Sequence, residues 1–153
     1  MLVKAGVKNS IYILGVEGIE ICSMHIKPIK TGFPYHPFTF ALLVEDNLGN
    51  KIFHEGHIAR SSFLKANNIK ADTVILTAEE VKLFGFLRLG MDSKRTLEAC
   101  NLLGAKNLFI TGSNPEKTTG LISKFLLTKP LEKTKIESEI KIYHQAGDSI
   151  KLS

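Results

Sequence analysis

The sequence feature that most constrains the fold is a change of hydrophobic period near Ser61. Before it, β-branched and aromatic residues form short apolar runs, which predict strands over residues 10–14, 19–30 (broken near Ser23), 38–46 and 51–55. After it, helical patterns alternate with runs typical of buried strands. Strands followed by helix–strand units indicate an α/β domain with a mixed sheet.

Local signals sharpen this prediction. The turn residues "NLGN" (47–50) between two apolar runs predict a hairpin. "SSFLKANNI" (61–69) predicts a short helix capped by serine, and "DTVILTA" (72–78) predicts a buried strand.

The clearest unit is "MDSKRTLEACNLLGAKNLFITG", in which Asp92 or Ser93 caps a helix, Gly104 ends it and residues 108–111 form a strand. A further helix is expected over residues 118–127, and the chain is expected to close with "EIKIYH", a turn at residues 146–148, and the strand "SIKLS".

Length and composition define the class of protein. The 153 residues, 44% of them hydrophobic, predict one domain over residues 1–153. No apolar run approaches the ~20 residues that span a bilayer, and residues 1–10 lack a secretory signal, so we expect a cytoplasmic protein without a membrane partner. The net charge of +5 comes from lysines interleaved with glutamates, which indicates a solvated surface and argues against nucleic-acid binding. Cys22 and Cys100 are expected to be buried and reduced.

Two of the five histidines, His54 and His57, occur in "KIFHEGH" at the end of a predicted strand. The spacing H-E-G-H matches neither the H-E-x-x-H helix of zinc proteases nor a zinc finger. The residues alone therefore favour a strand end with polar side chains facing solvent over a metal site. Glu55 would serve as a base only beside an ion or a substrate.

Four stretches, taken in order, resemble a known family: "KAGVKNSIYILGVEGIEICSMHIKPI", "GNKIFHEGH", "ADTVILTAEE" and "LGMDSKRTLEACNLLGAKNLFIT". Together with the closing "GDSIKL", they resemble the C-terminal part of metallo-β-lactamase-fold hydrolases. The likeness is to the ascorbate-lactonase-like branch, and within it to cyanobacterial and plant-type relatives. This resemblance implies half of an αββα sandwich, in which a mixed β-sheet carries helices on one face.

The resemblance also implies a metal site, of which little remains. The family's H-x-H-x-D-H motif is not found among the histidines of this sequence. His36 and His57 correspond to two of the metal ligands, while Gly112 stands where the last histidine would be. Two imidazoles do not hold a catalytic ion tightly without further ligands. We therefore assign no catalytic residue, name His36 and His57 as the metal candidates, and expect zinc only if a partner completes the site.

Half of a sandwich would leave the inner face of its sheet exposed to water, because that face is apolar in the complete fold. We therefore expect a homo-oligomer, or a complementary chain that carries the other half. The favoured hypothesis is a hydrolase-like protein that is non-catalytic, inactive as this chain alone, and acts through oligomeric assembly. The alternative is a subunit or fragment of a zinc-dependent hydrolase whose N-terminal metal-binding half comes from another chain or from upstream sequence.

Overall fold

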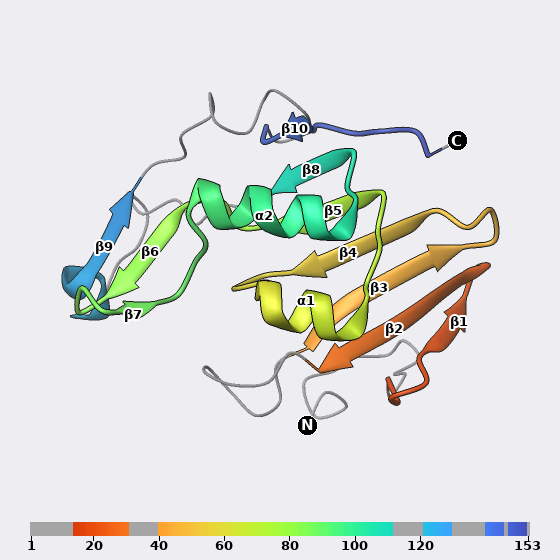
Figure 1. The fold of residues 1–153 in the computed structure, drawn as a ribbon, viewed down its shortest axis with the longest axis horizontal. Coiled ribbons are helices and arrows are strands. Elements are labelled where there is room, and N and C mark those ends of the chain that lie inside the picture. Colours follow the sequence, from red (N-terminus) through yellow and green to blue (C-terminus); the bar gives the residue numbers. More distant parts are fainter. Residues whose placement is uncertain (1–13, 31–39, 112–120, 130–139, 146, 153) are drawn as a thin grey trace, which may run out of the picture.

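The fold is built around one large mixed sheet with helices on a single face (Figure 1). The computed structural model describes residues 14–30, 40–111, 121–129, 140–145 and 147–152. Among these, the strands are β1 (Ile19–Ile21), β2 (Met24–Lys30), β3 (Phe40–Asp46), β4 (Lys51–Glu55), β5 (Thr73–Leu76), β6 (Glu80–Leu83), β7 (Leu87–Arg88), β8 (Asn107–Ile110), β9 (Leu126–Lys129) and β10 (Lys141–Tyr143). The helices are α1 (Ser61–Asn67), α2 (Ser93–Leu103) and the 3-10 helix η3 (Leu121–Phe125).

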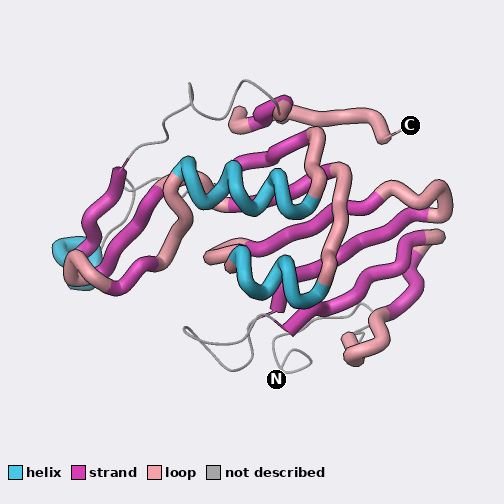
Figure 2. Tube along the Cα trace, viewed as in Figure 1, coloured by secondary structure: helices cyan, strands magenta, loops and turns pink. Residues whose placement is uncertain are grey.

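The strand order of the large sheet is β1-β2-β3-β4-β5-β8-β10. Neighbouring strands from β1 to β4 are antiparallel, whereas β4, β5, β8 and β10 run parallel. Parallel neighbours need crossover connections, and α1 and α2 lie within the first two of these. The predicted α/β class, with a mixed sheet and helices on one face, is confirmed (Figure 2).

The hydrophobic core lies between this sheet and the two helices. Fully buried side chains from the sheet meet Leu64 of α1 and Leu103 of α2; those of the sheet are Ala41, Phe53, Val74, Leu76 and Leu108. Strand side chains alternate between faces, so the neighbours of these residues lie on the other face. No described helix is long and apolar enough to cross a bilayer.

The hairpin predicted at residues 47–50 joins β3 to β4. The carboxylate of Asp46 accepts hydrogen bonds from the backbone N–H groups of Leu48 and Asn50, both 2.9 Å, and from the Asn50 side chain at 2.8 Å. Gly49 takes φ +85°, a conformation that most side chains disfavour. The Asn50 side-chain amide is the main reason that the pKa of Asp46 lies below its ordinary value.

The predicted termini of α2 are confirmed. Asp92 is the N-cap, its carboxylate accepting the backbone N–H of Arg95 at 2.9 Å. Gly104 ends the helix in the left-handed conformation at φ +74°.

Four sequence predictions need correction. Ser61 is not the cap of α1, because Arg60 holds the extended cap position and makes no side-chain cap bond. Residues 121–127 do not form an α-helix, since η3 is followed by β9, which pairs with β6. No strand forms within residues 149–152. Cys22 is exposed, because it lies at positive φ in the tight turn between β1 and β2. The strand predicted at residues 10–14 lies almost wholly outside the described residues.

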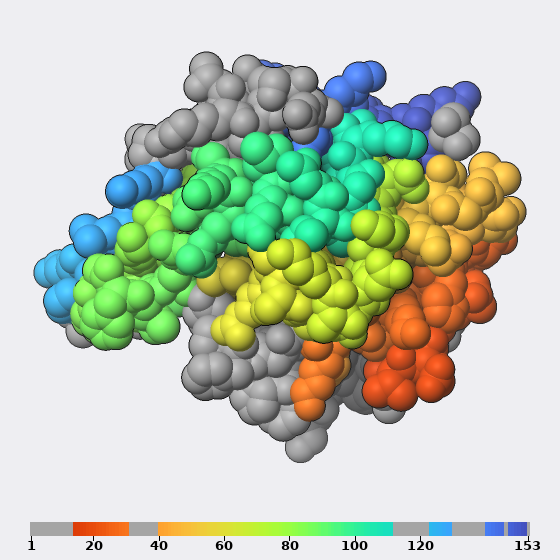
Figure 3. All heavy atoms as spheres, in the orientation of Figure 1, coloured from red at the N-terminus to blue at the C-terminus, as the bar shows by residue number. Residues whose placement is uncertain are grey.

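The second, smaller sheet was not predicted. Its order is β7-β6-β9, and it forms an arm at the left of Figure 3, beside the helices that cover the middle of the visible face. Three aromatic rings gather on the arm, with ring centres of Phe84 at 6.3 Å from Phe86 and 5.1 Å from Phe125. Each of these rings is exposed.

Replacing Asp92 with alanine should lower the free energy of unfolding by about 1 kcal/mol, because the first turn of α2 loses its cap. Asp92→Asn keeps an acceptor for the Arg95 N–H and should lose less than half as much. Urea unfolding followed by far-UV circular dichroism measures both. Equal losses would show that the ion pairs of Asp92 with Arg88 and Arg95 matter more than the cap.

The two cysteines should differ sharply in reactivity. Burial raises the pKa of the Cys100 thiol to about 12, whereas Cys22 is exposed. A thiol reagent at about pH 8 should therefore modify only Cys22 in the folded protein, since the thiolate is the reactive form. The Cys22→Ser variant should react only after denaturation. Rapid labelling of that folded variant would contradict the burial of Cys100.

Candidate site at the carboxyl end of strand β4

The carboxyl ends of β4, β5 and β8 meet at one edge of the large sheet, because these strands are parallel neighbours. Ligands of open α/β sheets bind outside such an edge. Glu55 ends β4, Thr77 follows β5, and Thr111 follows β8. The "KIFHEGH" segment singled out by its histidines therefore lies where a site is expected.

Glu55 and His57 form the central pair of this site. The Glu55 side chain is buried, and its Oε1 accepts the backbone N–H of His57 at 3.0 Å. The His57 side chain is 59% exposed, with its Nδ1 3.8 Å from the same oxygen. The expectation of solvent-facing polar side chains thus holds for His57 and is wrong for Glu55. Glu55 points inward because it follows Phe53 by two residues and so lies on the same, helix-covered face of β4.

A hydrogen-bond bracket centred on Thr77 fixes this pair on the scaffold. The Thr77 hydroxyl donates to the carbonyl of His57 at 2.9 Å and accepts the N–H of Met91 at 3.2 Å. The Thr77 carbonyl accepts the Thr96 hydroxyl of α2 at 2.9 Å. The loop after β4, the loop after β5 and the start of α2 are therefore tied together.

His54 and His57 do not converge. His54 pairs in register with Leu42 and Ile75, which places it on the opposite face of β4 from Glu55. His36 and Gly112 lie outside the described residues. Within the part of the chain that the structure describes, no three histidine, cysteine or acidic side chains come together in a way that could hold a metal ion.

These residues do not fit a catalytic zinc ion, which takes three protein ligands and a water molecule. What His57 and Glu55 provide is an exposed imidazole beside a buried carboxylate, a pair able to exchange a proton with a bound group. The histidines were visible in the sequence, but the bracket of Thr77 was not. Its only signal was a threonine directly after the apolar run "VIL".

Removing the Thr77 hydroxyl should loosen this bracket. Thr77→Val leaves the Met91 N–H and the His57 carbonyl without their partner, which should lower stability by about 1–2 kcal/mol. Amide hydrogen exchange at Met91 should accelerate, while Thr77→Ser should keep both the stability and the slow exchange. Unchanged exchange at Met91 in the valine variant would show that the bracket does not hold this loop.

The sequence matches no protein-family model and no curated protein. Solved structures of similar fold do exist. The metallo-β-lactamase fold protein YhfI from Bacillus subtilis has a TM-score of 0.56 and 13% identity, over 88% of this chain and 52% of that one. Igni18, a metallo hydrolase from Ignicoccus hospitalis, has a TM-score of 0.51 and 16% identity, over 94% and 60%. CmlA, a diiron β-hydroxylase from Streptomyces venezuelae, has a TM-score of 0.51 and 14% identity, over 71% and 26%.

These similarities concern the fold. The chain spans about half the length of YhfI and a smaller part of CmlA. The similarity extends over 71–94% of this chain. The chain therefore has a metallo-β-lactamase-like α/β fold.

Proposed function

We propose that this chain is a non-catalytic, metallo-β-lactamase-like protein that acts through assembly. In this proposal, residues 1–153 form one domain that corresponds to the C-terminal half of the fold, in the ascorbate-lactonase-like branch. The partner is a second copy of the chain, which packs on the sheet face that carries no described helix.

The observation that supports assembly is the composition of this face. Register pairs place apolar side chains side by side across four neighbouring strands; they are Ile26, Pro28, Leu42, Val44, Ile52 and Ile75. All of them are partly accessible, whereas their neighbours on the helix-covered face include the fully buried Ala41 and Phe53. Soluble monomers rarely expose apolar patches beyond a few hundred Å².

Residues of the C-terminal segment lie at one end of this face. Ile150 and Leu152 line a shallow pocket of about 290 Å³ together with Ile75 and Phe109. Leu42 and Val44 are not among the residues of that pocket. A second copy that packs on β2 and β3 would cover the apolar side chains of this face that lie outside that pocket.

The alternative function is that of a subunit or fragment of a zinc-dependent hydrolase. The supporting observation is the exposed imidazole of His57 at the carboxyl end of β4, beside the buried Glu55. In this proposal His57, with His36, would supply ligands to zinc, and another chain or upstream sequence would supply the H-x-H-x-D-H half. Stoichiometric zinc in the purified protein would favour this function over the first.

A charge on the open face should break the assembly. Val44→Lys should convert the expected dimer into a monomer, because an unpaired ammonium would be desolvated in the interface. Leu48→Lys, at the 74% exposed tip of the β3–β4 hairpin, serves as the matched control and should remain dimeric. Sedimentation velocity measures the mass, and circular dichroism verifies the fold. A monomeric unmodified protein at all concentrations would contradict assembly through copies of this chain.

A further inference from the structure

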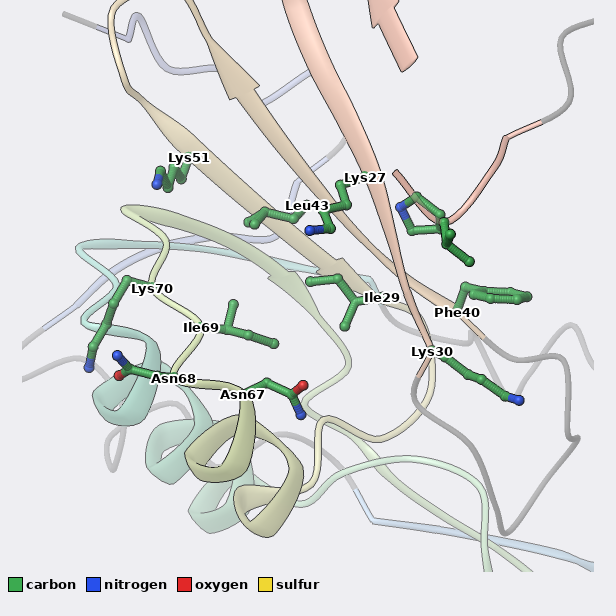
Figure 4. A pocket seen from close by; sticks show the side chains of 12 residues that line it. Lys27, Ile29, Lys30, Phe40, Leu43, Lys51, Asn67, Asn68, Ile69 and Lys70 are labelled. Atoms are coloured by element: carbon green, nitrogen blue, oxygen red, sulfur yellow. The ribbon is translucent and has the colours of Figure 1, made fainter. Parts of the chain in front are cut away.

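A second feature lies on the helix side of the large sheet, away from the edge that carries Glu55 and His57. It is a groove of about 750 Å³ between β2 and the end of α1 (Figure 4). Ile29, Leu43 and Ile69 give it apolar walls, and the partly exposed Phe40 lies at one end. Its volume falls in the range of ~300–1,000 Å³ typical of small-ligand sites.

The groove gathers positive charge. Among the residues that the structure describes, four lysines and no acidic side chain line it; the lysines are Lys27, Lys30, Lys51 and Lys70. They come from β2, from the start of β4 and from the segment after α1, so the fold brings together lysines that are scattered along the sequence. Two carboxamides, Asn67 and Asn68, add polar groups at the end of α1.

Two of the four lysines are already engaged. Lys51 pairs with Glu45 at 3.3 Å, and Lys70 donates to the Leu102 carbonyl at 2.8 Å. Lys27 and Lys30 make no hydrogen bond or ion pair with another residue that the structure describes. Figure 4 shows the Lys27 side chain alongside Leu43, so a cationic group and an apolar surface are neighbours.

We propose that this groove binds a small amphiphilic anion, a carboxylate carried on an alkyl or aryl body. The anionic group would lie at Lys27, and the apolar body would lie against Ile29, Leu43 and Ile69. Lysine stems extend the apolar lining while their ammonium groups stay hydrated. The two parts of the groove thus match the two parts of one ligand.

The arrangement of the lysines also argues against an acidic polymer, such as a nucleic acid, as the ligand. A nucleic acid needs cations that follow a backbone, with release of several counterions along the track. Here the lysines surround an apolar surface of limited size. This proposal does not depend on what covers the other face of the sheet.

The test is a titration of the full chain with decanoate, followed by backbone amide NMR. The amide signals of Leu43, Ile69 and Lys70 should shift and saturate, with a dissociation constant of roughly 0.1–1 mM for a ligand of this size. Decanol lacks the charge and acetate lacks the body, so each should bind about ten-fold more weakly or not at all.

Variants separate specific binding from general hydrophobic adsorption. Lys27→Gln should weaken decanoate binding by about two- to five-fold, as expected for a partly exposed ion pair. Lys94→Gln, which removes an exposed lysine of α2, should bind like the unmodified protein. Lys27→Gln also shortens a side chain whose stem lies alongside Leu43, so decanol binding should weaken, but less than decanoate binding does.

Any one of four results would overturn the proposal. Decanoate could fail to saturate the signals below ~10 mM. Decanol could bind as tightly as decanoate, or the Lys27→Gln variant could bind decanoate as tightly as the unmodified protein. Shifts confined to the pocket at Ile75 and Phe109 would place the ligand on the wrong face.

Discussion

The constraint on which the structure depends is that the described helices cover only one face of a seven-stranded sheet. An α-helix is about 10 Å wide and strands are about 4.8 Å apart, so two helices cover about four strands. Phe53, Val74 and Leu108 lie under them and are fully buried. The strands beyond α1 receive no such cover from the described helices, and the opposite face receives none at all. Both the assembly proposal and the groove follow from this mismatch.

The same alternation of side chains explains the edge site. Because Glu55 follows Phe53 by two residues, its carboxylate lies on the core side, and burial is tolerated because it accepts the His57 backbone N–H. His57 lies beyond the last residue of the strand, so the alternation of faces does not direct its side chain into the core. Its imidazole is exposed to solvent. The Thr77 bracket then holds the loop in place. A loop held in this way could support a metal site or an interface. The described residues supply too few ligands for a metal site.

The sequence was most informative where a local rule sufficed. "NLGN" predicted its hairpin and "KIFHE" its strand, while Asp92 and Gly104 predicted the ends of α2, because caps and turns depend on residues close in sequence. The small sheet could not be predicted by such local rules. Its strands pair residues far apart, Glu80 with Lys129 for example, so tertiary pairing replaces the predicted helix from Leu126 onward. The lysine-lined groove was hidden for the same reason. Charges that alternate with glutamates in sequence can still gather in space.

The position of the groove also follows from strand length. Strand β1 pairs only with residues 24–26 of β2, so β2 from Lys27 onward has no neighbour on that side among the described strands. Pro28 fits there because an edge position needs no backbone N–H for the sheet. At the same place α1, with seven residues, extends only about 10 Å along the sheet. A short helix and a short edge strand therefore leave one corner of the sheet open, and Lys27 and Ile29 reach that corner on the same face. The opening is a consequence of how the elements fit, and its lining gives it a preference for anions with an apolar body.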